Sequence, residues 1–235
     1  MNLDFTVFTF GLPILLKGLG NTILFCAISI VCGFVIACLI ALCRLSRRSF
    51  LRLPALWFVE VFRNTPFLVQ AFILFFAFPR LGVRIDATVA GIMVLSLYAG
   101  AYFSESIRGA ILSVPKGQIE AARALGMPYL RAMRCIVLPQ SLGYLLPATT
   151  NQIIGVIKDS AALSVITVPE LSMAAQVVLG ESFSPVETYV MVAILYWALT
   201  ACVAAMMAYF ERRVAAAAVA TTSESARFAT AGKSH

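Results

Sequence analysis

Long stretches of this chain carry no charged side chain. They cover residues 22–43, 64–79, 87–104, 135–157 and 188–210. A helix needs about 20 apolar residues to cross the roughly 30 Å hydrocarbon core of a bilayer, and these stretches approach or exceed that length. Extended to whole helices, they predict five membrane spans, at about 22–43, 57–79, 87–109, 142–167 and 188–210.

Composition supports lipid as the solvent of these helices. Hydrophobic residues make up 61% of the 235 residues and charged residues only 12%, whereas soluble domains carry about 25% charged residues. The prediction is an all-α integral membrane protein whose transmembrane part covers 22–213. Residues 1–21 are expected to be a periplasmic or interfacial segment before an uncleaved signal-anchor, because they lack a basic start and a cleavage site. The tail 214–235, rich in Ala, Ser and Thr, is expected to be cytoplasmic and disordered.

The net charge of +7 is explained by topology better than by nucleic-acid binding. Of the 18 basic residues, 14 lie after spans 1, 3 and 5 or at the entry to span 2, and only Lys17, Arg80 and Arg84 lie on the opposite side. Basic residues in short loops mark the cytoplasmic side. The N-terminus is therefore predicted outside and the C-terminus in the cytoplasm.

Neither a metal site nor a cofactor is predicted. The six cysteines form no CxxC pair, and the one histidine is His235 at the end of the tail. The cysteines are interpreted as small apolar residues of the spans.

The longest loop between spans, residues 113–140, has a patterned sequence of its own and is called the coupling loop below. Helix formers around Ile119 predict a short amphipathic helix, and Gly126 suits the left-handed position that follows a helix end. Pro128 suits the first turn of a second helix, which is expected to end at Pro139. The loop is therefore predicted as two helices joined by a glycine elbow on the inner membrane surface.

The spacing within this loop resembles the EAA loop of bacterial ABC-importer permeases. The match comprises Glu120, Ala121, Ala122, Gly126, Ile136, Leu138 and Pro139. The segments VEVFRNTPFLVQ (59–70), GAYFSESIR (100–108) and KDSAALSVI (158–166) are similar to the polar amino acid permeases of the same family.

This resemblance implies the ABC-importer permease (MetI-like) fold and a non-enzymatic role in importing a polar amino acid. It implies several partners: cytoplasmic ATP-binding subunits, an identical or homologous permease, a periplasmic solute-binding protein, and the lipid bilayer. The loop residues named above would couple the chain to the ATPase. This chain is not expected to hydrolyse ATP, because a phosphate-binding loop needs a glycine five residues before Gly-Lys-Ser, and Arg227 occupies that position before Gly232.

Two charges within the predicted fourth span are candidates for substrate contact. Lys158 and Asp159 follow a long uncharged stretch, and intramembrane charges usually face a cavity or a partner. They could form a structural ion pair between helices, but an amino acid carries one carboxylate and one ammonium, and adjacent Lys and Asp would suit both. Ser160 and Ser164, four residues apart, would add hydroxyls on one helical face.

Further polar residues complete the predicted site. Gln152, Gln70 and Tyr102 are expected to face the pathway, with Pro66 kinking the second span before Gln70. In relatives that carry cationic amino acids the position of Gln152 is often glutamate, so the resemblance weighs mildly against a cationic substrate. Two pairs spaced i,i+3 are expected to be structural ion pairs, Glu60 with Arg63 and Glu105 with Arg108.

Two other classes of protein remain as alternatives. An ion-coupled secondary transporter would also use midplane charges, but a lone transporter has no need of a docking loop. An intramembrane enzyme is disfavoured, because no HExxH sequence or comparable catalytic pattern is present.

Overall fold

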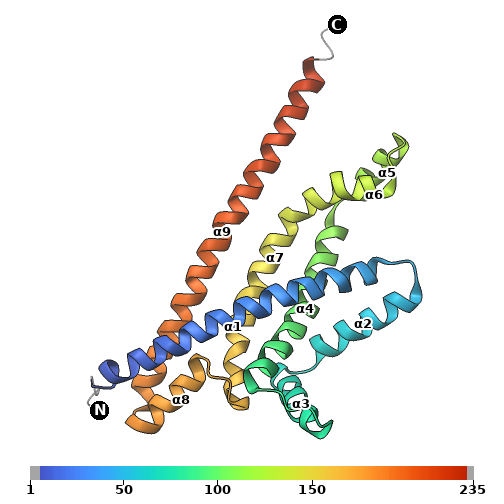
Figure 1. Ribbon diagram of the computed structural model, residues 1–235. Helices are drawn as coiled ribbons and strands as arrows, with labels where there is room; N and C mark the ends of the chain where they lie inside the picture. Colours follow the sequence, from blue (N-terminus) through green and yellow to red (C-terminus); the bar gives the residue numbers. More distant parts are fainter. Residues whose placement is uncertain (1–5, 232–235) are drawn as a thin grey trace. The chain divides into compact units, whose positions relative to one another are not determined.

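The computed structural model describes residues 6–231, and the side chains of residues 7–214 and 216. Within this part, all regular secondary structure is helical. The α-helices, shown in Figure 1, are α1 (Thr6–Leu45), α2 (Ser49–Asn64), α3 (Phe67–Arg80), α4 (Ala87–Ser113), α5 (Lys116–Ala124), α6 (Tyr129–Ala132), α7 (Leu138–Asp159), α8 (Leu171–Ser182) and α9 (Pro185–Ala231). A π-helical turn, η1 (Met133–Val137), precedes α7, and a 3₁₀ helix, η2 (Ser160–Ile166), follows it.

The helices account for five spans if bent helices are counted as single spans. Val7–Leu45, Ala87–Ser113 and Pro185–Val214 are each long and apolar enough to cross a membrane. Two further pairs of helices are long and apolar enough only when each pair is taken together as one bent span. These are α2 with α3, bent by 112°, and Tyr129–Ile166 with α8, bent by 51°. The predicted number of spans therefore matches, with the second and fourth spans broken.

Two helix ends differ from the prediction. Helix α1 starts at Thr6, within the segment expected to be interfacial. Leu15 is fully buried in a cluster with residues of α8 and α9, which include Leu171, Val178 and Met191. At the other end, α9 continues as a helix to Ala231, where a disordered tail was expected from residue 214. Alanine is the strongest helix former, so a helix can continue without an apolar stripe; residues 232–235 lie outside the described part.

The chain divides into two compact units. The first comprises Met1–Glu105 and Asn151–Cys202, and the second comprises Ser106–Thr150 and Val203–His235. In the first unit α1 packs along α8, and η2 packs against α3 and α8. Close helix approach in this unit depends on glycine: a Cβ on Gly33 of α1 would lie 2.8 Å from the Cβ of Ala99 in α4.

The break in the second span lies where the sequence predicts it. Thr65 is extended (φ −112°, ψ 143°), as the residue before a proline usually is. Pro66 then precedes α3, and its carbonyl accepts the first hydrogen bonds of that helix from Val69 and Gln70, at 3.1 and 3.2 Å. The predicted kink at Pro66 is confirmed as a complete break between two helices.

In the second unit the coupling loop contains the predicted elbow. Gly126 has φ +79°. Its N–H donates to the carbonyl of Arg123 at 3.0 Å, and the N–H of Met127 donates to that of Ala122, also at 3.0 Å. This pair of bonds is a Schellman motif, which ends a helix with a left-handed residue.

The expectation that Pro139 ends the second helix of the loop is wrong. The chain passes from α6 through η1 into α7 with Pro139 as the second residue of α7. A proline inside a helix lacks an N–H and collides with the carbonyl four residues earlier. The π turn immediately before α7 changes the hydrogen-bonding pattern there and so accommodates the ring.

Candidate functional site

The predicted midplane residues lie where α7 changes into η2. Lys158 and Asp159 are the last two residues of α7, and Ser160 is the first of η2. Lys158 is exposed, Asp159 is partly buried, and Ser160 and Ser164 are buried. The Ser160 hydroxyl donates to the carbonyl of Ile157 at 2.7 Å, and that of Ser164 to Ala161 at 2.8 Å. The two charged side chains are thus more accessible than the two hydroxyls.

Asp159 is paired with an aromatic side chain that the sequence did not single out. The Tyr98 hydroxyl, on α4, faces the Asp159 carboxylate and is placed to donate a hydrogen bond to it. The Tyr98 ring lies 4.7 Å from the Tyr102 ring one turn along α4, measured between centroids. Phe67, the first residue of α3, packs edge-on against Tyr98 at 5.0 Å.

A cation lies at the other end of this aromatic pair. The guanidinium carbon of Arg63 is 5.5 Å from the centroid of the Tyr102 ring, within the range of a cation–π interaction. Asp159, Tyr98, Tyr102 and Arg63 therefore form a continuous line contributed by α7, α4 and α2. The i,i+4 spacing of the two tyrosines could have indicated their contact, but their link to Asp159 depends on packing.

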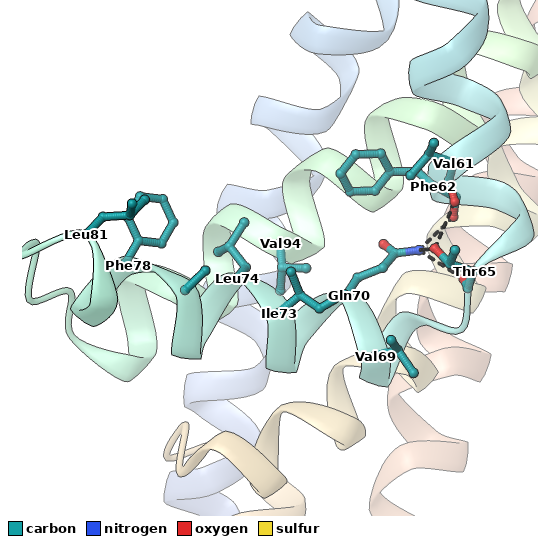
Figure 2. A pocket seen from close by; sticks show the side chains of 11 residues that line it. Val61, Phe62, Thr65, Val69, Gln70, Ile73, Leu74, Phe78, Leu81 and Val94 are labelled. Carbon is teal, nitrogen blue, oxygen red and sulfur yellow. Dashed lines mark hydrogen bonds between the residues drawn. The ribbon is translucent and has the colours of Figure 1, made fainter.

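The Gln70 amide nitrogen is bonded across the break in the second span. This Nε2 lies 2.8 Å from the Phe62 carbonyl, 2.9 Å from the Thr65 carbonyl and 2.7 Å from the Thr65 hydroxyl. Figure 2 shows the side chain reaching from α3 across the break to the end of α2. Gln70 therefore replaces hydrogen bonds that the break at Pro66 removes.

Beside Gln70 lies an apolar cavity of about 310 Å³. Its wall consists of residues of α2, α3 and α4, among them Phe62, Ile73 and Val94 (Figure 2). Gln70 Oε1 is buried without a hydrogen-bond partner in the described part of the chain. The cavity otherwise offers almost no polar group, so its chemistry suits hydrocarbon rather than a charged molecule.

Gln152 lies on α7, partly buried, seven residues before Asp159. Residues seven apart lie on the same face of an α-helix, and seven residues span about 10.5 Å. Gln152 and Asp159 are therefore aligned along one face of α7.

The residues of the predicted ion pairs have several kinds of partner. The Glu60 carboxylate accepts a hydrogen bond of 2.8 Å from the Asn64 amide, and Arg63 lies over Tyr102. Glu105 forms an ion pair with Arg44 at the end of α1. Spacing along one helix did not predict these three contacts, because two of them join different helices. Arg108 lies partly buried near the end of α4.

The residues predicted to contact an ATPase are unevenly exposed. Glu120, Ala121, Leu138 and Pro139 are exposed, and Ile136 is partly exposed. Ala122 is only 4% exposed and packs within the loop. The tip of the elbow instead exposes two leucines, Leu125 at 87% and Leu130 at 79%. Exposed apolar side chains at a loop tip are typical of a protein interface.

Known proteins resemble the chain over most of its length. A probable amino-acid ABC transporter permease, YckA of Bacillus subtilis, is 39% identical over 203 residues, 86% of this chain and 90% of the relative. A putative glutamine transport system permease, GlnP of Rickettsia bellii, is 35% identical and covers 85% of this chain and 92% of its own. A solved amino acid ABC transporter with histidines has a TM-score of 0.86 and 33% identity over 91% of this chain and 100% of the solved chain.

The fold, the sequence similarity and the pattern of the coupling loop all indicate one family. Residues 8–216 match the family described as binding-protein-dependent transport system inner membrane component. The chain belongs to this family of multi-pass inner-membrane permeases.

Proposed function

We propose that this chain is the membrane-spanning subunit of an ATP-driven importer for a polar amino acid. It works with a second permease, identical or homologous, with two ATP-binding subunits and with a periplasmic solute-binding protein. The N-terminus lies outside and the coupling loop lies in the cytoplasm. The ATPases close on ATP, move the coupling loops and expose the site alternately to each side.

The observation that carries the substrate class is the arrangement around Asp159. Lys158 and Asp159 bring opposite charges to the end of a membrane helix, and Tyr98 orients the carboxylate. Asp159 binds the α-ammonium group and Lys158 binds the α-carboxylate, groups that every amino acid shares. The change from α-helix to 3₁₀ helix alters backbone hydrogen bonding at this point, as in other interrupted membrane helices that bind substrates.

The coupling surface comprises Glu120, Ala121 and the exposed leucines at the elbow, Leu125 and Leu130. Glu120 offers a charged anchor and Ala121 allows close approach of the partner. The leucines supply apolar area that would otherwise remain in water, at roughly 25 cal/mol for each Å² buried. ATP hydrolysis takes place in the partner chain.

The test is uptake by proteoliposomes that contain the assembled importer and its binding protein. Radiolabelled L-glutamine, L-glutamate and L-arginine are offered outside, with ATP inside. Uptake of at least one amino acid is expected only with ATP, and Asp159→Asn is expected to abolish it. Asp86→Asn is the matched control, because Asp86 lies exposed before α4 and asparagine caps a helix as well as aspartate does.

Two outcomes would contradict the proposal. Uptake driven by a sodium or proton gradient without ATP would favour an ion-coupled secondary transporter. ATP-dependent uptake that is normal in Asp159→Asn would place the substrate site elsewhere and leave this charge a structural one.

A further inference from the structure

A second carboxylate lies deep among the helices of the first unit, away from the substrate site proposed above. Glu170 is 1% exposed and immediately precedes α8. One carboxylate oxygen accepts a hydrogen bond from the Met173 N–H at 2.8 Å, and the other accepts from the Tyr196 hydroxyl of α9, also at 2.8 Å. The carboxylate thus caps α8 and ties it to α9.

Two residues of α1 also hold the chain around Glu170 by hydrogen bonds. The Asn21 amide donates to the Pro169 carbonyl at 2.7 Å, and the Thr22 hydroxyl accepts from the Leu171 N–H at 3.0 Å. Three residues before Glu170, Thr167 has φ 64°, a left-handed angle that β-branched residues rarely adopt. Such a conformation persists only where the surroundings hold it.

The same tyrosine reaches the other end of η2. The Tyr196 hydroxyl lies 3.2 Å from the Ser172 hydroxyl and also faces Ser160, the residue after Asp159. Tyr196 therefore lies between Glu170, beyond the end of η2, and the start of η2. Each acidic residue that flanks the segment has a tyrosine as its neighbour: Tyr98 faces Asp159, and Tyr196 donates a hydrogen bond to Glu170.

This segment needs such support. η2 comprises seven residues, whereas 3₁₀ runs longer than three or four residues are uncommon. A 3₁₀ helix rises about 2.0 Å per residue and an α-helix about 1.5 Å, so relaxation of seven residues to α would shorten the segment by about 3.5 Å. A shift of that size exceeds the tolerance of a hydrogen bond and would separate Asp159 from its partner.

We propose that Glu170 and Tyr196 are positioning residues that hold η2 in its stretched 3₁₀ form and so set the place of Asp159 in the substrate site. Neither residue touches the substrate. The inference rests on the proposed function, because it assigns a consequence for transport to the position of Asp159.

The central variant is Tyr196→Phe, which removes one oxygen atom and preserves the ring. Tyr189→Phe is the matched control, since Tyr189 is exposed on the same helix seven residues earlier. Glu170→Ala and Glu170→Gln form a second pair, because glutamine can still accept the backbone hydrogen bond and interact with Tyr196. All variants are assembled with the ATP-binding subunits and the binding protein, and assembly is checked by co-purification.

Two measurements are made on each assembled variant. The first is the rate at which a membrane-permeant thiol reagent modifies Val165→Cys, introduced into η2 after the exposed cysteines are replaced by alanine; Val165 is exposed. This measurement needs no substrate. The second is ATP-driven uptake of radiolabelled L-glutamine, L-glutamate and L-arginine over a range of concentrations, which separates the half-saturating concentration from the maximal rate.

Tyr196→Phe is expected to change the modification rate at least threefold and to raise the half-saturating concentration about three- to tenfold, the range of coupling between linked sites. Tyr189→Phe should do neither, and Glu170→Gln should retain more transport than Glu170→Ala. An unchanged modification rate in Tyr196→Phe overturns the positioning role whatever uptake does. If Asp159→Asn abolishes uptake, a changed modification rate in Tyr196→Phe without a change in the half-saturating concentration also overturns the positioning role. If Asp159→Asn transports normally, the proposed substrate site has failed, and the positioning role fails with it.

Discussion

Polar side chains within the apolar helices of this permease have partners at the breaks in the spans or on neighbouring helices. Gln70 bonds to the end of α2, Tyr98 faces Asp159, and Arg63 lies over Tyr102. A polar group left without a partner in hydrocarbon costs several kcal/mol. The pairings therefore contribute to the stability of the bundle, and a substrate that binds Asp159 does so beside the Tyr98 hydroxyl.

At the residue scale, Gln152→Glu tests which residue recognises the substrate side chain. Gln152 shares a face of α7 with Asp159 about 10.5 Å away, too far to bind the same α-amino group. A carboxylate at this position is expected to shift preference toward L-arginine about tenfold or more, because hydrogen bonds to charged groups contribute roughly 1.5–3 kcal/mol. Competition of L-arginine, L-glutamine and L-glutamate for uptake measures the shift.

The control for this prediction is Gln140→Glu, the same change at an exposed position of α7. An equal shift in both variants would reflect general attraction of cations. An unchanged order of preference in Gln152→Glu would remove Gln152 from the specificity site.

At the element scale, function and irregular backbone coincide. The second span breaks at Pro66, the fourth passes through η2, and the coupling loop turns at Gly126. Each interruption has a local cause: a missing N–H, a stretched 3₁₀ helix or a left-handed glycine. In the first unit, α1 packs along α8 and against α2, and α4 approaches Leu163 of η2 at Gly91.

Substitutions at Gly126 test whether docking depends on the backbone angle at the elbow of the coupling loop. The Gly126 φ of +79° costs a residue with a Cβ about 1–2 kcal/mol, and a β-branched side chain suffers most. Gly126→Val is expected to insert in the membrane normally but to lose co-purification with the ATPase and most ATP-driven uptake. Gly126→Asn is the control, because asparagine tolerates the left-handed region and a Cβ at this position meets no atom within 4 Å. Equal loss in both variants would mean that the side chain, rather than the backbone angle, obstructs docking.

A substitution at Gln70 tests whether its hydrogen bonds stabilise the break between α2 and α3. Gln70→Leu leaves the carbonyls of Phe62 and Thr65 without their donor, and each unsatisfied group costs about 1–3 kcal/mol. The purified permease complex is expected to unfold at a clearly lower temperature than the wild type. Gln140→Leu, at an exposed position, should unfold within about a degree of wild type, and an unaffected Gln70→Leu would show that the break is held by other contacts.

At the scale of the whole molecule, the distribution of basic residues predicts which way the chain crosses the membrane. Loops expected on the cytoplasmic side carry 14 of the 18 basic residues, and three lie on the opposite side. This arrangement requires that the bent second and fourth spans each pass from one side of the membrane to the other.

Topology is tested by labelling single cysteines with a membrane-impermeant thiol reagent in intact cells, in a chain without exposed native cysteines. Arg84→Cys, in the loop before α4, should be labelled from outside, and Arg123→Cys, in α5, only after the cells are opened. Both positions are exposed, so accessibility within the protein does not differ between them. The reverse pattern would contradict the orientation and the cytoplasmic position of the coupling loop.

The sequence by itself determined the features that depend on short-range chemistry. Charge-free stretches predicted the apolar spans, Thr65-Pro66 predicted the break between α2 and α3, and Gly126 predicted the left-handed elbow. These follow from the properties of single residues or of one helix: a proline lacks an N–H, glycine alone is unstrained at positive φ, and a bilayer sets the length of a span. The spacing around Glu120 and Gly126 also identified the family, which the comparisons confirm.

Only the tertiary structure decided which side chains meet. Glu105 pairs with Arg44 of α1, Arg63 lies over Tyr102, and Tyr98 faces Asp159. None of these contacts follows from spacing along one helix, because each partner comes from a different helix and its position depends on how the helices pack. The same reason explains why Ala122 proved buried and Leu125 exposed, since the face that a short helix covers is set by its neighbours and not by its own pattern.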